Sequence, residues 1–221
     1  ALPPLHRGTR GLLVGDGAEG EDDIESSSGA AYVFKRDGDT WIQETKLTAS
    51  DGKSSANFGK SVSISGDYAA VGSRGDNQAA YIFKRDGEIW SEVSIVKIDD
   101  EESGGFGDSV SLHGDFLAVS APWHRHTYYI NEGAVYIFQR MGQNWVQVEK
   151  IYDESAFAND YFGIDNAVSI SDQFVAVGVE EDARAYAYEY VSCPCKGDVN
   201  GDCFVNLSDL IISLEVLAGT A

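Results

Sequence analysis

Short segments in which aliphatic residues alternate with serine recur along the chain. Val62 and Ile64 lie between serines, and the same alternation returns in the segments 110–112 and 168–170. A period of two places alternate side chains on opposite faces of a β-strand. We therefore expect three equivalent strands with one apolar face each, on which the buried residues are Val62, Ile64, Val110, Leu112, Val168 and Ile170.

Three further strand-like segments follow the serine-rich one between residues 58 and 100. They are Ala69-Ala-Val71, Tyr81-Ile-Phe83 and the segment from Trp90 to Val96. Arg85-Asp-Gly-Glu88 separates the last two, and Asp-Gly between apolar runs is a strong hairpin signal. The pattern predicts a four-stranded antiparallel meander. We expect small residues where sheets approach closely and aromatic residues between sheets, namely Ala69, Ala70, Gly72, Ala79 and Ala80 in the first role and Tyr81, Phe83 and Trp90 in the second.

The meander occurs four times, with approximate bounds 11–52, 58–100, 106–152 and 162–190. Trp41, Trp90 and Trp145 mark equivalent points that lie 49 and 55 residues apart, a spacing in the range of propeller blades. Four-stranded units arranged radially form a β-propeller. The first copy lacks its opening strand and the last its closing strand, so we expect an all-β fold whose sheets have three, four, four and three strands.

Composition and charge narrow the range of partners. The chain of 221 residues has 16 basic and 36 acidic residues and a formal charge of −20, which disfavours nucleic acid and anionic membranes and attracts divalent cations. The same acidity would keep an extracellular protein soluble. There is no apolar run of about 18 residues, so we expect no membrane span. Residues 1–10 are expected to be a frayed end, and the missing initiator Met suggests an excerpt or a processed form.

The order of motifs within each copy resembles that of a known repeat. Phe58-Gly, Ser-Val-Ser-Ile, Gly-Asp, Ala-Val-Gly and Ala-Ala-Tyr-Ile-Phe, followed by Trp, are similar to the bacterial FG-GAP repeat, which is related to the blades of the integrin α-subunit propeller. The resemblance covers residues 11–190 and implies a propeller that binds protein or carbohydrate. The Gly-Ala-Pro part departs from the family pattern, as Gly72-Ser73, Ser120-Ala-Pro122 and Gly178-Val179. The integrin calcium loops are matched neither at 73–77 nor at 123–132.

Several shorter motifs are given a structural interpretation. Arg74-Gly-Asp76 spells an adhesion tripeptide, but we expect an ordinary hairpin loop. His124 and His126 have a metal-like spacing without an evident third ligand, so we expect a surface loop. The segment 16–25 holds six carboxylates, and either a calcium site or a solvated loop would explain it. No Ser-His-Asp order, phosphate loop or paired carboxylate site is evident, so we do not expect an enzyme.

The C-terminal segment 192–221 carries a pattern of a different kind. Oxygen-bearing residues occupy positions 1, 3, 5, 7, 9 and 12 of an EF-hand-type loop, namely Asp198, Asn200, Asp202, Phe204 through its carbonyl, Asn206 and Asp209. Leu210, Leu214 and Leu217 then follow at helical spacing. We predict a Ca²⁺-binding loop followed by a helix, as a small module after the propeller domain 11–191.

This segment resembles one half of a dockerin type I module, which implies docking to a cohesin-like partner. Position 6 of the loop, normally Gly, is Cys203, and a disulfide to Cys193 or to Cys195 would offset the backbone cost. Three cysteines so close together indicate an oxidising compartment.

Together these features predict a non-catalytic, calcium-binding protein, secreted or at the cell surface. Its propeller would bind an extracellular protein or glycan, and its dockerin-like segment would anchor it. The alternative is the non-catalytic part of a secreted polysaccharide-degrading enzyme, a glycoside hydrolase or lyase whose catalytic domain lies outside this chain.

Overall fold

The computed structural model describes residues 12–15, 28–99, 103–126, 129–180 and 184–189. These residues form β-strands and loops, and none of them lies in a helix. Consequently no described segment is a helix of the length and apolarity that a bilayer crossing requires. The predicted end segment 1–10, the acidic loop 16–25 and the C-terminal module 192–221 lie outside the described residues.

Four antiparallel sheets follow one another along the chain, and we call them blades one to four. Blade one has the order β1 (Leu12–Gly15), β2 (Ala31–Asp37), β3 (Thr40–Leu47). Blade two has the order β4 (Phe58–Ser65), β5 (Tyr68–Ser73), β6 (Ala79–Asp86), β7 (Ile89–Val96). Blade three has the order β9 (Val110–His113), β10 (Phe116–Ala121), β12 (Ala134–Met141), β13 (Asn144–Ile151). Blade four has the order β14 (Val168–Ile170), β15 (Phe174–Val179), β16 (Arg184–Glu189).

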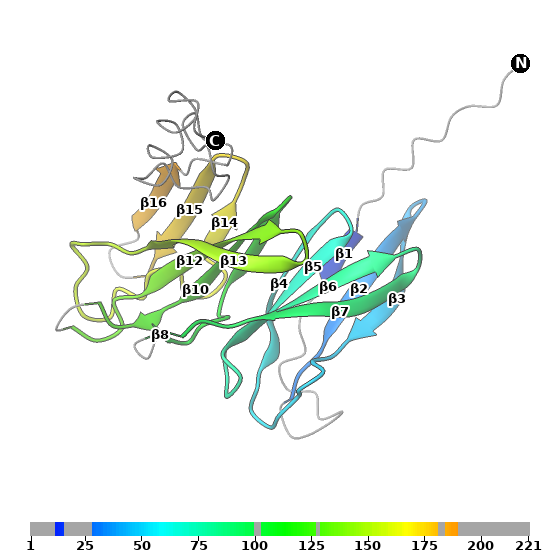
Figure 1. Cartoon of the computed structure of the whole chain (residues 1–221), viewed down its shortest axis with the longest axis horizontal. Coiled ribbons are helices and arrows are strands. Elements are labelled where there is room, and N and C mark those ends of the chain that lie inside the picture. Colours follow the sequence, from blue (N-terminus) through cyan, green and yellow to red (C-terminus); the bar gives the residue numbers. More distant parts are fainter. Residues whose placement is uncertain (1–11, 16–27, 100–102, 127–128, 181–183, 190–221) are drawn as a thin grey trace, which may run out of the picture.

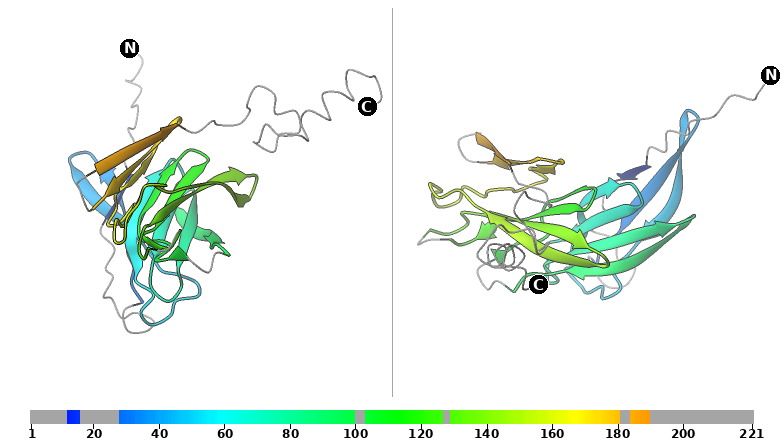
Figure 2. Two further views of the ribbon diagram at one scale, coloured as in Figure 1. Left: turned by 90° about the vertical axis from the view of Figure 1, so that its left-hand side faces the viewer. Right: turned by 45° about the horizontal axis from the view of Figure 1, so that its top comes forward.

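The strand numbers of three, four, four and three agree with the expectation from the repeats. A fifth, two-stranded sheet of β8 (Ser103–Gly104) and β11 (Trp123–His124) was not predicted. Figure 1 shows the blades side by side in chain order, and the two views of Figure 2 show that neighbouring sheets face each other. The opening strands β4, β9 and β14 are neighbours in this arrangement.

The hydrophobic core lies between neighbouring blades. Blades one and two enclose one cluster, blades two and three a second, and blades three and four a third. Tyr81 and Phe83 are buried, whereas Trp90 is half-buried. Ala69 and Ala79 pack with these aromatic residues between blades one and two, and Ala70 and Ala80 pack between blades two and three. The sheets therefore stabilise one another face to face, as predicted from the alternation of small and aromatic residues.

An aromatic contact repeats at the start of blades two, three and four. The ring of Phe58 meets Tyr81 edge-on at 5.2 Å, and Phe106 meets Tyr136 in the same way at 5.7 Å. In blade four Phe162 lies 5.9 Å from Tyr186. Such pairs add to the stability that burial provides, so the Phe of each Phe-Gly motif fixes the first strand against the third.

The glycine that precedes the third strand allows the next blade to approach. Gly29 and Gly133 both have positive φ, of 80° and 86°. A Cβ atom on Gly29 would lie 2.1 Å from the carbonyl oxygen of Phe58, and one on Gly133 would lie 2.4 Å from the amide nitrogen of Phe162. Only glycine combines this backbone conformation with this closeness.

The serines of the alternating segments join one blade to the next. Ser63 Oγ accepts a 2.9 Å hydrogen bond from the amide of Leu112, and Ser111 Oγ accepts one of 3.0 Å from the amide of Ile170. Ser65 Oγ likewise accepts from the amide of Gly114. These amides lie on the open edge of a first strand, and an uncapped strand edge is a liability. The serines thus cap edges that would otherwise lack partners.

The expected burial of the alternating aliphatic residues is correct for four of the six. Val110, Leu112, Val168 and Ile170 are buried. Val62 and Ile64 are only half-buried, although they pack against the cluster between blades one and two. The reason is that blade one, as described, has no strand beyond β1 to cover them.

A β-bulge recurs in the outer hairpin of blades one, two and three. The register shifts after Val33, after Ile82 and after Ile137, which are equivalent positions. The extra residue in the last strand is Glu44 in blade one and Val93 in blade two. These two residues therefore occupy the same place in successive blades, although one is acidic and the other apolar.

Candidate functional site

Two long loops meet at one end of blades three and four. One joins β10 to β12 and the other joins β13 to β14. The amide of Asn159 donates to the carbonyl of Ile130 at 2.9 Å, and that of Tyr161 donates to Asn131 at 3.0 Å. The side chains of Asn131 and Asn159 are also hydrogen-bonded, at 2.9 Å. The two loops are thereby held as one ordered unit.

Three large apolar side chains stand exposed on these paired loops. Tyr129 is 48% exposed, Ile130 57% and Phe157 63%. The rings of Tyr129 and Phe157 lie 6.3 Å apart. We call these three residues the loop patch. Apolar groups gathered on a fixed loop are typical of binding surfaces.

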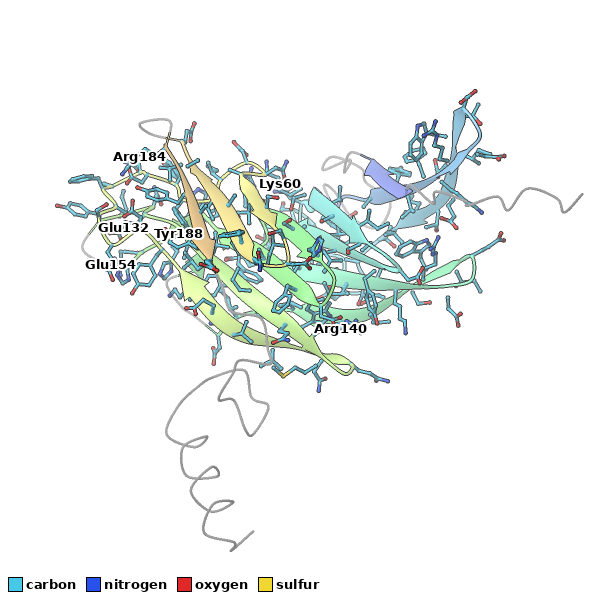
Figure 3. The ribbon with its side chains drawn as sticks, turned by 90° about the horizontal axis from the view of Figure 1, so that it is seen from above. Lys60, Glu132, Arg140, Glu154, Arg184 and Tyr188 are labelled. Atoms are coloured by element: carbon cyan, nitrogen blue, oxygen red, sulfur yellow. The ribbon has the colours of Figure 1, made fainter. Side chains whose placement is uncertain are left out.

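Two further contacts involve His126 of the first loop. The carboxylate of Glu132 is almost fully buried and accepts a 2.6 Å hydrogen bond from the amide of His126. The ring of His126 stacks on Tyr152, with 3.7 Å between centroids. In the view of Figure 3, Glu132, Glu154 and Arg184 all lie toward one end of the molecule.

Blade four anchors the second loop through charged groups. Arg184 lies 3.1 Å from Asp160 and 3.5 Å from Asp153, and the hydroxyl of Tyr186 donates to Asp153 at 2.6 Å. This hydrogen bond is the main reason that the pKa of Tyr186 lies above its ordinary value. Burial alone would raise the pKa of Asp153, but the hydrogen bonds from Tyr186 and Ser155 outweigh burial and lower it. Burial, with the Asp153 charge, raises the pKa of Tyr188 to about 12. The arrangement keeps the carboxylate charged and the phenols neutral, as a structural role requires. We call this hydrogen-bonded group of Asp153, Tyr186 and Arg184 a latch.

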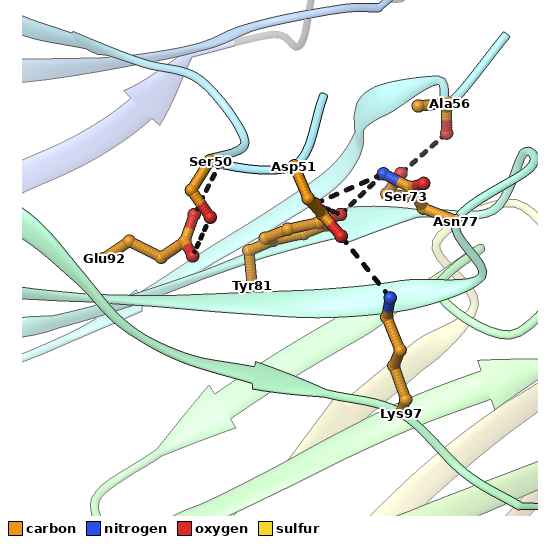
Figure 4. Close-up of polar contacts among 8 residues, drawn as sticks. All are labelled: Ser50, Asp51, Ala56, Ser73, Asn77, Tyr81, Glu92 and Lys97. Atoms are coloured by element: carbon orange, nitrogen blue, oxygen red, sulfur yellow. Dashed lines mark hydrogen bonds and ion pairs between the residues drawn. The ribbon is translucent and has the colours of Figure 1, made fainter. Parts of the chain in front are cut away.

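Blade two contains the equivalent latch, drawn in Figure 4. The hydroxyl of Tyr81 donates to Asp51 at 2.5 Å and accepts from the amide of Asn77 at 2.7 Å. Lys97 lies 3.4 Å from the other oxygen of Asp51. Nearby, Glu92 accepts hydrogen bonds from the amide and the hydroxyl of Ser50. In both latches a tyrosine of the third strand fixes the loop that leads into its own blade.

No metal site is formed within the described part of the chain, where no three His, Cys, Asp or Glu residues come together. In the two latches Arg184 and Lys97 supply the positive charge next to the carboxylates. His126 is exposed as expected, but the expectation of a surface position for His124 is wrong. His124 lies on β11 and is buried with its ring against Tyr136, because side chains alternate along a strand and Trp123 takes the exposed position.

The Arg74-Gly-Asp76 tripeptide is part of the scaffold. Arg74 lies 2.6 Å from Asp108, whose side chain is fully buried, and its guanidinium lies over the ring of Trp123. A Cβ atom on Gly75 would lie 1.8 Å from the carbonyl oxygen of Ser55. The arginine is therefore engaged and the glycine enclosed, which supports the structural interpretation.

A small polar cavity of about 280 Å³ lies along the first strands of blades two, three and four. Its lining includes Lys60, Ser63, Ser111 and Asn166. Lys60 reaches across it to Asp165, with 3.0 Å between the charged atoms. Because two of the serines already accept interblade hydrogen bonds, the cavity belongs mainly to the scaffold.

The predicted calcium ligands are not among the residues that the structure describes. Asp198, Asn200, Asp202, Phe204, Asn206 and Asp209 all fall in the segment 190–221. The calcium loop, and the pairing of Cys203 with Cys193 or Cys195, therefore stay predictions. Sequence patterns, for their part, gave no signal for the loop patch, because it depends on contacts between two separate loops.

Comparison with known proteins supports the interpretation of the repeats. A family model described as FG-GAP repeat matches residues 41–83 and residues 90–138. The first match runs from β3 to β6 and the second from β7 to β12, so each begins at the Trp of one blade and ends at the third strand of the next. No curated protein matched the chain. The two matches and the four-stranded sheets support an FG-GAP-like protein of the β-propeller type, a type of domain that serves binding or adhesion.

Proposed function

We propose that this protein is a non-catalytic binding module whose loop patch contacts an extracellular protein or glycan. The observation that carries the proposal is the exposure of Tyr129, Ile130 and Phe157 on loops whose backbones are hydrogen-bonded to each other. Ordering a flexible loop on binding costs free energy, and a loop that is already fixed avoids that cost. Exposed aromatic side chains on a rigid base are well suited to become the anchors of an interface.

The C-terminal segment extends the proposal. Its calcium loop, formed by the six residues from Asp198 to Asp209, would fold the segment and present a helix to a cohesin-like partner. The resemblance of this segment to half a dockerin also supports the alternative, a non-catalytic part of a secreted polysaccharide-degrading enzyme. In both proposals the blades bind a ligand and catalyse no reaction.

Binding by the loop patch is tested with arrays of extracellular proteins and of glycans probed with the wild-type chain. Any ligand found is then titrated against the double variant Tyr129→Ala/Phe157→Ala. Loss of two anchor side chains should weaken binding at least tenfold. Ile89→Ala is the matched control, because Ile89 is 70% exposed at the far end of blade two. Failure of both arrays to yield a ligand, or unchanged affinity in the double variant, would refute the proposal.

A further inference from the structure

A cleft lies between blades two and three, at the end of the strands opposite the loop patch. The loop patch adjoins the start of β12 and the end of β13, whereas the cleft adjoins the hairpin that joins these two strands. Its volume is about 350 Å³, and its lining includes Tyr68, Lys84, Val93, Arg140, Gln143 and Trp145. Figure 3 shows Arg140 well apart from Glu132 and Glu154.

Two cations flank one aromatic ring in this cleft. The guanidinium of Arg140 lies 4.5 Å from the ring centroid of Tyr68, and Nη1 donates to the Tyr68 hydroxyl at 3.2 Å. Lys84 Nζ lies 5.7 Å from the same centroid. Asp115 pairs with the other end of the guanidinium. Arg140 is thus held in a fixed orientation, while Lys84 is exposed and mobile enough to follow a ligand.

The residues that line the cleft include no carboxylate. The cleft thus differs in the sign of its charged side chains from the chain as a whole, which has 36 acidic and 16 basic residues. Arg140 is already paired with Asp115, which lies outside the lining, so the attraction of the cleft for an anion depends mainly on Lys84. An arginine held by neighbours is preorganised to bind a carboxylate or a sulfate.

The equivalent cleft between blades one and two has the opposite character. It is lined by Lys35, Asp37, Ile42, Gln43, Glu44 and Glu88. Lys35 corresponds to Lys84, the bulge residue Glu44 corresponds to Val93, and the turn residue Glu88 corresponds to Gln143. Both clefts contain the lysine. Glu44 and Glu88 of the cleft between blades one and two are replaced by Val93 and Gln143 in the cleft between blades two and three. Blade packing alone therefore does not dictate the charge of the cleft between blades two and three.

We propose that the cleft between blades two and three binds an acidic saccharide, with its anionic group held by Arg140 and Lys84. A sugar ring presents an apolar face and a rim of hydroxyl groups. Trp145, which is half-buried, and Val93, which is 49% exposed, supply apolar surface. The Gln143 amide is exposed and can both donate and accept hydrogen bonds. The volume is in the range of small-ligand sites. This proposal does not depend on the loop patch.

The test uses calorimetric titration of the full chain with hexagalacturonate. Cellohexaose is the neutral control, a sulfated hexasaccharide distinguishes sulfate from carboxylate, and hexaglutamate represents an acidic peptide. We expect saturable binding of one or both acidic saccharides and none of cellohexaose. Binding should weaken at least tenfold in Lys84→Glu and in Val93→Glu/Gln143→Glu, which introduces the acids of the equivalent cleft.

Lys35→Glu is the matched control, because it makes the same charge change at the equivalent position of blade one. It should bind as the wild type does, and thermal melting confirms that all the variants are folded. The proposal is overturned if neither acidic saccharide binds, if hexaglutamate binds as well as they do, or if Lys84→Glu and Lys35→Glu have equal effects.

Discussion

The carboxylate of Asp108 accepts a 2.6 Å hydrogen bond from the guanidinium of Arg74, a residue of the preceding repeat. Its second oxygen accepts one of 2.7 Å from the amide of Asp165, in the following repeat. One buried carboxylate thus ties three successive repeats together. The pair also explains why the tripeptide around Arg74 belongs to the scaffold.

Replacing Asp108 by alanine should be costly. The change leaves the Arg74 charge, with only 24% of its side chain exposed, and the Asp165 amide without this acceptor. Breaking a buried pair in this way costs about 3–5 kcal/mol. Asp39→Ala is the control, since Asp39 and its partner Arg36 are both exposed, and a surface pair contributes at most about 1 kcal/mol. Guanidinium denaturation measures both free energies of unfolding, and equal losses would contradict the assignment.

The latch between Tyr81 and Asp51 predicts a difference in unfolding free energy between two Tyr→Phe variants. Tyr81→Phe removes a buried hydroxyl that joins Asp51 to Asn77, and the loss should be about 1–3 kcal/mol of unfolding free energy. Asp51→Asn keeps an oxygen to accept from Tyr81 and should cost less. In Tyr188→Phe the deleted hydroxyl has no hydrogen bond to the described residues, so that variant serves as the control. A smaller effect for Tyr81→Phe than for Tyr188→Phe would disprove the latch.

The same latches predict how stability depends on pH. Burial alone would raise the pKa values of Asp51 and Asp153 in the folded state. The tyrosine hydrogen bonds, together with Lys97 at Asp51 and with Ser155 and Arg184 at Asp153, outweigh burial and lower both. A lowered pKa adds stability that is present above the unfolded value, near about 3.9, and is lost as the pH falls through the folded value. The double variant Asp51→Asn/Asp153→Asn should therefore be less stable than the wild type at pH 7. Urea denaturation between pH 7 and 2 should show the two curves converging below about pH 4, and a constant gap would argue against this account.

Much of the fold follows from the sequence, for reasons visible in particular residues. Alternation around Val110 and Val168 predicted the strands, and the recurring order of motifs gave four copies, three of which contain the marker Trp. The two-residue strands β8 and β11 could not be predicted, because two residues carry no period. The alternating serines were interpreted only as a polar face, since their partners lie in another copy. The loop patch and the contact of Arg74 with Asp108 likewise depend on residues far apart in the chain.

The C-terminal calcium loop makes a prediction that calorimetry can test on the full chain. Ca²⁺ should bind one saturable site, because Asp198, Asp202 and Asp209 supply carboxylates at EF-hand spacing. Binding should increase helical circular dichroism, since metal binding and folding are coupled in small modules. Asp198→Ala should abolish the site, whereas Asp22→Ala in the acidic segment 16–25 should leave it intact. A titration that Asp198→Ala does not change would show diffuse cation binding instead.

The serine caps carry a consequence for how such a chain changes in evolution. Each cap joins a residue to the equivalent strand of the next copy, 49 residues away for Ser63 and 59 for Ser111. The partner is a backbone amide, which any amino acid except proline supplies. Recombination that adds or removes one whole copy in register therefore recreates the same cap at the new junction. The contacts between the first strands therefore define how one copy joins the next, and they do not fix the number of copies. Evolution is free to add or remove copies while the outer clefts and the loops vary from one copy to another.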